Sequence, residues 1–150
     1  MARVLERLLH AGEAAHYQDP KYNVQLLRLA TRISINRTVA GMHFPVDNLA
    51  GAVLGLILAD YLVARATCTS GKCDLETAFF NGAAFDNAGG TQDFVPEEFI
   101  ELPGMKLKQL PWLEKLLVNG ERPKISGKFA PRAVSWLWKQ SKKEWREKDA

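Results

Sequence analysis

The sequence predicts an all-α domain, a helical bundle that spans residues 1–150 as one unit and contains a long irregular loop. Apolar residues recur at helical spacing in several segments, and we find no convincing run of strand-like alternation. The length of 150 residues favours a single domain with a modest core. A hydrophobic share of 47% and a charged share of 25% are typical of a globular protein. The net charge of +3 selects no partner by itself.

The first predicted helix covers residues 2–16, and the Gln18-Asp19-Pro20 sequence ends it. Charged residues interrupt its apolar ones, so the segment is not a secretory signal, and a soluble, cytoplasmic chain is the default expectation. Four apolar residues share one side of this helix and should be buried, namely Val4, Leu5, Leu8 and Leu9.

A long second helix is predicted from Tyr22 to Gly41. We expect one side of it to be buried, because apolar residues recur there at about 100° per residue. Arg37 lies within this stripe, and a buried guanidinium requires an anion, either a carboxylate of the protein or a bound ligand. The stripe consists of Leu26, Leu29, Ala30, Ile33, Arg37 and Ala40.

The chain should turn a tight corner after this helix. Gly41 is a typical residue at a helix end, and Pro45 is favoured as the first residue of the next helix. His43 is therefore predicted in the corner. Asp47 falls in the first turn of the following helix, where the helix dipole favours a carboxylate, and it is close enough in sequence to reach the imidazole.

The third predicted helix covers residues 46–66. Its apolar run from Leu49 to Leu58 is bounded by Asp47 and Asp60 and is too short to cross a bilayer, so we expect a core helix and no transmembrane span. Small residues at four-residue steps predict that another helix packs closely against it. They are Gly51, Gly55 and Ala59.

Residues 67–104 are rich in Gly, Asp and Asn and predict a long loop region within the domain. Cys68 and Cys73 either close a small disulfide ring or remain two unpaired thiols. Short helices are predicted at residues 95–100 and 111–118, and a final helix at residues 133–148.

The final helix combines basic residues with Trp136, Trp138 and Trp145. Such a helix either binds nucleic acid or a membrane surface, or packs its tryptophans and solvates its charges. We favour packing, and we expect no nucleic-acid partner. The predicted packing stripe is Val134, Leu137, Trp138, Ser141 and Trp145.

The corner carries a specific motif. Five residues separate Arg37 from His43, and three separate His43 from Asp47. This spacing resembles the third signature motif of the type 2 phosphatidic acid phosphatase superfamily, which includes bacterial acid phosphatases and vanadium-dependent haloperoxidases. The flanking residues 39–51 look most like the soluble bacterial haloperoxidase-like branch. Asn36 departs from the usual Ser before the Arg.

The resemblance implies roles for three residues. Arg37 would bind the oxygens of phosphate or vanadate, and Asp47 would orient His43. In a phosphatase, His43 would be the nucleophile toward a phosphate ester, and no cofactor would be needed. In a haloperoxidase, His43 would be the ligand of vanadium in a vanadate cofactor, and the substrates would be peroxide and halide.

The first two signature motifs of the superfamily are absent. The sequence contains no Pro-Ser-Gly-His, and the pattern Lys115, six residues, Arg122-Pro123 lies downstream of the third motif, so we treat it as chance. The resemblance thus implies the C-terminal half of such an enzyme, completed by a missing N-terminal half or by another subunit of a homo-oligomer. The alternative is a non-catalytic helical remnant or interaction module, in which a buried Arg37 simply pairs with Asp47.

Overall fold

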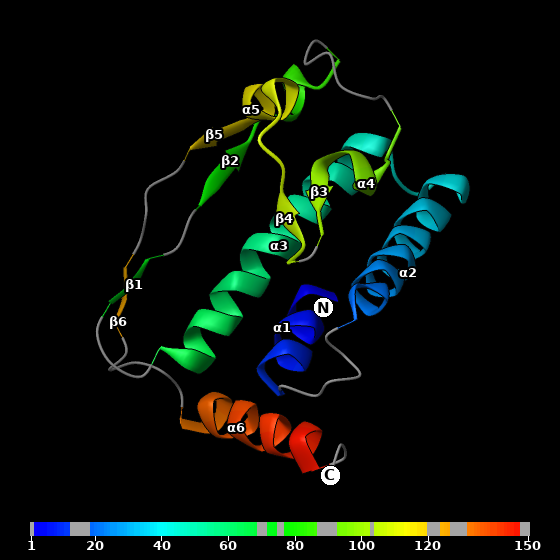
Figure 1. The fold of residues 1–150 in the computed structure, drawn as a ribbon. Coiled ribbons are helices and arrows are strands. Elements are labelled where there is room, and N and C mark those ends of the chain that lie inside the picture. The colour runs from blue at the N-terminus through cyan, green and yellow to red at the C-terminus, as the bar shows by residue number, and fades with distance from the viewer. Residues whose placement is uncertain are drawn as a thin grey trace.

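The computed structural model describes residues 2–12, 19–68, 72–74, 77–86, 93–102, 104–119, 124–126 and 132–147. These residues are mostly helical, which confirms the all-α class. The two longest helices, α2 (Pro20–Val39) and α3 (Pro45–Thr67), run in opposite directions from a shared corner (Figure 1). Helix α1 (Ala2–Gly12) packs against both, and α6 (Arg132–Glu147) lies across α1 and α3.

The buried side of α1 differs from the predicted leucine stripe. Arg3 and Glu6 are buried together with Leu9, whereas Leu5 is exposed. The charge of Arg3 is tolerated in the interior because its donors have hydrogen-bond partners, and a periodicity of apolar residues cannot reveal such partners. The remainder of the predicted helix, residues 13–16, lies outside the described residues.

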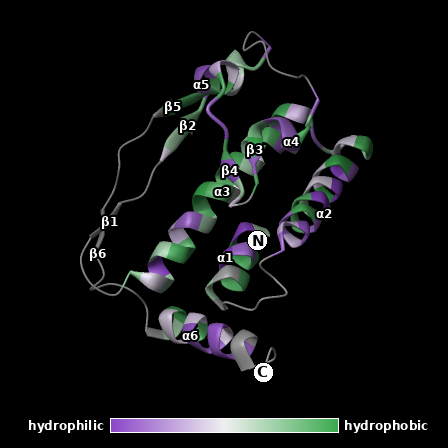
Figure 2. Ribbon diagram, in the orientation of Figure 1, coloured by the Kyte–Doolittle hydropathy of each residue, from purple (hydrophilic) through white to green (hydrophobic). Residues whose placement is uncertain are grey.

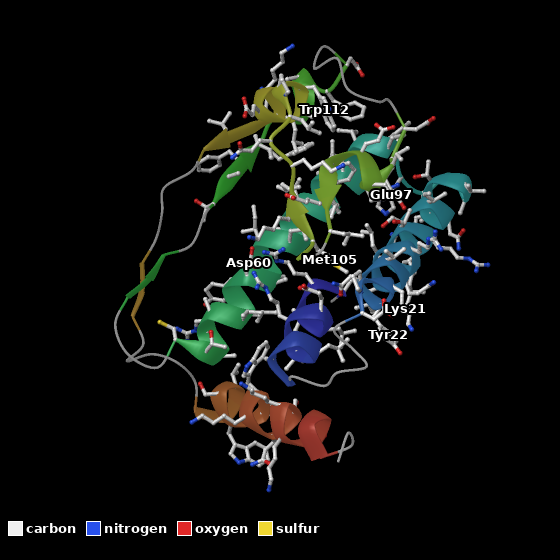
Figure 3. All side chains as sticks on the ribbon, in the orientation of Figure 1. Lys21, Tyr22, Asp60, Glu97, Met105 and Trp112 are labelled. Atoms are coloured by element: carbon white, nitrogen blue, oxygen red, sulfur yellow. The ribbon has the colours of Figure 1, made fainter. Side chains whose placement is uncertain are left out.

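Arg3 connects three elements. Its Nε and Nη2 atoms donate to the two carboxylate oxygens of Asp60 on α3, at 2.7 and 2.9 Å. Its Nη1 atom donates to the backbone carbonyls of Gly104 and Met105. Figure 3 shows Asp60 and Met105 close to the start of α1. This fork fixes α1 against both α3 and the turn at residues 104–105.

The ends of α2 and α3 agree with the sequence. Asp19 caps α2 by accepting a hydrogen bond from the backbone N–H of Lys21 at 2.9 Å. Gly41 follows the end of α2 with φ +71°, a conformation that glycine adopts without strain. Pro45 is the first residue of α3, as predicted.

The predicted buried side of α2 is wrong. Leu29 and Ile33 are 59% and 58% exposed, and Arg37 is exposed too. The buried residues of α2 are instead Asn23 and Leu27. The periodicity correctly located an apolar face, but the described residues cover the neighbouring face of the helix.

Helix α3 is a core helix on one side only. Leu49, Val53 and Ala59 are buried, whereas Leu54 and Leu58 are 65% and 51% exposed. The whole helix has 23 residues with a mean hydropathy of 1.7 in its most apolar window, so by length and composition it could cross a membrane. The expectation of no transmembrane span was based on the shorter apolar run from Leu49 to Leu58, and it stays a prediction.

The segments after α3 contain short strands that the sequence did not predict. β1 (Lys72–Asp74) pairs with β6 (Lys124–Ser126), β2 (Ala78–Phe80) with β5 (Leu117–Asn119), and β3 (Ile100–Glu101) with β4 (Lys106–Leu107), all antiparallel. Strands of two or three residues are too short to show alternation. Cys68 is disulfide-bonded, which answers the question that its sequence left open.

Short helices complete the fold at η2 (Gly82–Ala84), α4 (Pro96–Phe99) and α5 (Pro111–Leu116), the last two close to their predicted ranges. The hydrophobic core lies between these short helices and one side of the α2–α3 pair. Its buried members are Leu27, Leu49, Phe94, Phe99, Ile100, Met105, Leu113 and Leu116.

The predicted packing stripe of the last helix, α6, is only partly correct. Trp138 is half-buried, but Leu137 is largely exposed, as is Trp136 outside the stripe. The side chain of Trp145 lies outside the described residues.

Candidate functional site

The corner between α2 and α3 holds the three motif residues as the sequence predicts. Arg37 lies in the last turn of α2, His43 in the corner, and Asp47 in the first turn of α3. The chain turns there because the backbone N–H of Gly41 donates to the carbonyl of Thr38, closing the end of α2.

Asp47 holds the corner together through one carboxylate oxygen. Its Oδ2 atom accepts a hydrogen bond from the backbone N–H of Phe44 at 2.9 Å and lies 3.7 Å from Nδ1 of His43. The second distance is that of an ion pair rather than a hydrogen bond. The carboxylate therefore faces Nδ1, which leaves Nε2 of the imidazole as the nitrogen for any ligand.

A second contact braces the same corner. Asn48 is buried, and its Nδ2 atom donates to Oγ1 of Thr38 at 2.6 Å. This hydrogen bond ties the start of α3 to the end of α2. The sequence did not identify Asn48 as a site residue, because its partner lies on another helix.

Arg37, His43 and Asp47 line one cavity of about 400 Å³. Its walls come from both long helices, from α1 and from the segment between residues 94 and 105. The cavity floor is largely apolar, with Leu27, Leu56 and Met105, whereas Thr31 and Ser34 of α2 add hydroxyl groups. The cavity thus has a largely apolar lining with a few polar side chains at its edge, which is typical of small-molecule sites.

Arg37 provides the unpaired cation of this cavity. Among the described residues, no carboxylate forms an ion pair with its guanidinium, and Asp47 faces His43 instead. This contradicts the alternative in which a buried Arg37 pairs with Asp47. An exposed guanidinium beside a cavity has its five N–H donors available for an anion.

Arg3 lines the same cavity and was not predicted as a site residue. Its donors are occupied by Asp60 and two carbonyls, so it contributes positive charge and not free hydrogen bonds. Lys115, from the chance match to the first signature motif, lies on α5 and does not line the cavity; Arg122 is outside the described residues.

Among the described residues, no group of three His, Cys, Asp or Glu side chains gathers where a metal ion could bind. No protein-family model, curated protein or solved structure matches this chain.

Proposed function

We propose that the α2–α3 corner binds a tetrahedral oxyanion, phosphate or vanadate, and that the chain is the C-terminal half of a phosphatase or vanadium-dependent haloperoxidase of the type 2 phosphatidic acid phosphatase superfamily. One observation carries this proposal. Arg37, His43 and Asp47 come from two helices and the loop between them, yet all three line one cavity.

Each side chain suits a different part of the task. The guanidinium of Arg37 presents a planar fork of donors that matches two oxygens of phosphate or vanadate. Asp47 faces Nδ1 of His43 and favours the tautomer that carries the proton there, so that Nε2 keeps its lone pair. Nε2 is then the nucleophile or the ligand.

In a phosphatase, Nε2 of His43 forms a bond to phosphorus while the bond from phosphorus to the ester oxygen breaks. The leaving oxygen takes a proton from solvent or from a group outside these 150 residues, which contain no Pro-Ser-Gly-His motif. Water then attacks phosphorus, the bond from phosphorus to Nε2 breaks, a proton of the water passes to solvent, and phosphate leaves the regenerated imidazole of His43. Arg37 stabilises the negative charge on the phosphoryl oxygens in both steps.

The same residues fit vanadate, because an imidazole nitrogen and an unpaired cation border one hollow. Bound vanadate would supply the activation of peroxide for halide oxidation. The chain would contribute Arg37 to hold the oxygens, His43 to hold the metal, and Asp47 to orient the imidazole.

The second candidate is a non-catalytic helical module. It is favoured by the His43 to Asp47 distance of 3.7 Å, which exceeds a hydrogen bond, and by the engagement of Arg3, the other cation of the cavity, with Asp60. An enzyme with one free cation has less stabilisation to offer a transition state.

Calorimetric titration of orthovanadate separates the two candidates. We expect saturable binding by the wild-type chain and a loss of about tenfold or more in affinity for Arg37→Ala and His43→Ala, since each removes a charged or metal-ligating partner. Arg32→Ala is the matched control, because Arg32 is an exposed arginine of the same helix that does not line the cavity.

If the folded wild-type chain binds no vanadate, the oxyanion proposal is overturned and the non-catalytic module leads. If binding is seen and depends on Arg37 and His43, hydrolysis of a phosphate ester and peroxide-dependent halide oxidation are assayed next to distinguish phosphatase from haloperoxidase.

A further inference from the structure

The α2–α3 pair exposes large apolar side chains along both helices. Leu29 and Ile33 on α2, and Leu54 and Leu58 on α3, each expose more than half of their surface. Figure 2 shows that much of α3 is hydrophobic in character. Contiguous apolar surface of this kind is typical of an interaction site.

These residues lie on one side of the pair. On α2, Leu29 and Ile33 adjoin the cavity-lining Arg37 at about 100° per residue, and on α3, Leu54 adjoins the cavity-lining Gly51. On each helix, the exposed residues are reached from the cavity-lining residues by rotating in the same direction about the helix axis, viewed from its N-terminus. Because the helices run in opposite directions, the two sets of exposed residues fall on the same side. We call this side the open face, and it comprises Leu29, Ile33, Leu54, Leu58, Tyr61 and Leu62.

The open face contains glycine positions without side chains as well as large exposed side chains. A methyl group built at Gly51 or Gly55 would meet nothing within 4 Å, so these positions are open to an approaching surface. Tyr61 and Leu62 are exposed about two to three turns further along α3. The face therefore has a small end and a large end.

We propose that the open face pairs with the open face of a second copy of this chain, with α3 antiparallel to α3 about a two-fold axis level with Leu56. The pairing follows from the residue order. Positions equally far from Leu56 become neighbours, so Gly51 faces Tyr61 and Leu54 faces Leu58 of the second copy. A small residue thus meets a large one at Gly51, and two leucines meet nearer the axis.

The charges at the two ends of α3 fit the same arrangement. Asp47 and Arg65 lie on the same side of α3 as the open face, one in the first turn and one in the last. They are equally far from Leu56, so an antiparallel pair brings Asp47 beside Arg65 of the second copy, twice over. A parallel arrangement would place like charges together. This pairing does not depend on whether the corner binds an oxyanion.

The area is close to what a stable dimer needs. From Asp47 to Arg65 the helix is about 28 Å long, and two adjacent helices are about 20 Å wide, so the face offers about 560 Å² per copy. Standard interfaces bury about 800 Å² per partner.

A lipid bilayer fits the same face less well. The opposite side of α3 packs against protein, and Asp60 in its second half holds the buried Arg3 in a two-point ion pair. A helix that crosses a membrane is apolar all round, and it seldom carries such a pair. One apolar face beside a charged, packed one indicates a protein partner.

Sedimentation equilibrium of the whole chain over a wide concentration range tests the proposal. We expect about twice the monomer mass of 16.8 kDa, and a shift to monomer for Leu58→Glu. Gly51→Leu should dissociate the dimer as well while leaving the monomer folded, because the new side chain has open space in one copy but meets Tyr61 of the other. Leu137→Glu, at an exposed leucine of α6, is the matched control and should remain a dimer.

A wild-type chain that stays monomeric at its highest soluble concentration would overturn the proposal. A dimer that survives Leu58→Glu and Gly51→Leu would overturn it too, because another surface would then hold the copies together. Co-sedimentation of the wild-type chain with phosphatidylcholine vesicles, lost in Leu58→Glu, would identify a membrane as the occupant instead.

Discussion

Both sides of the α2–α3 pair carry large apolar side chains, but the two sides differ in what covers them. On the covered side, Leu27 and Leu49 are buried beneath Met105 and the segments that follow α3. On the open face, Leu29 and Leu54 are mostly exposed. Helical periodicity therefore locates an apolar face but does not show whether the partner of that face belongs to the same chain.

The largest difference should appear between two leucines of α3. Leu49 is 4% exposed, so Leu49→Ala removes packed side-chain atoms and leaves a cavity, which typically costs about 2 to 5 kcal/mol of unfolding free energy. Leu54→Ala should cost less than about 0.5 kcal/mol in the monomer, because water already surrounds that side chain. Urea unfolding of both variants at low protein concentration measures the contrast. Equal losses would mean that the two sides are covered alike.

Much of the helical framework was predictable from the sequence because its signals are local. Asp19, Gly41 and Pro45 mark the ends of α2 and the start of α3 through hydrogen bonding and allowed backbone angles, which need no distant partner. The burial of Arg3 was not predictable in this way. It depends on Asp60 and on carbonyls about one hundred residues away.

The α2–α3 corner likewise combines features that local sequence predicts with features that depend on distant residues. The positions of His43 and Asp47 follow from short-range spacing, and the structure places them 3.7 Å apart as an i, i+4 pair. The prediction that Arg37 is buried failed because it assumed that every apolar stripe of α2 is covered. The contact of Asn48 with Thr38 joins two helices, so no local pattern announces its geometry.

Alanine substitutions at two glycines should change the stability by smaller amounts and in opposite directions. Gly41 has φ +71°, so Gly41→Ala forces a side chain into a left-handed conformation and should cost about 1 kcal/mol. Gly55 is helical and nothing lies within 4 Å of an added methyl group, so Gly55→Ala should stabilise the monomer by about 0.5 to 1 kcal/mol through helix propensity. Thermal unfolding at low concentration checks both signs. Destabilisation by Gly55→Ala would mean that the open face is packed.

The smallest effect belongs to the start of α2, which lies far from the corner. Hydrogen bonds from the backbone N–H and the ammonium group of Lys21 lower the pKa of Asp19 below its ordinary value of 3.8. A carboxylate with a lowered pKa in the folded state contributes stability above its unfolded pKa, and this contribution is lost as the pH falls through the lower, folded value.

Asp19→Asn keeps a capping oxygen but cannot titrate, so the variant should lose less stability than the wild type as the pH falls below 3.8. Urea midpoints measured in parallel at neutral and acidic pH reveal the difference. Identical pH profiles would show that Asp19 does not couple the folding of α2 to protonation. A difference confined to acidic pH would show that this end of α2 is fixed by its own cap, whatever covers the open face.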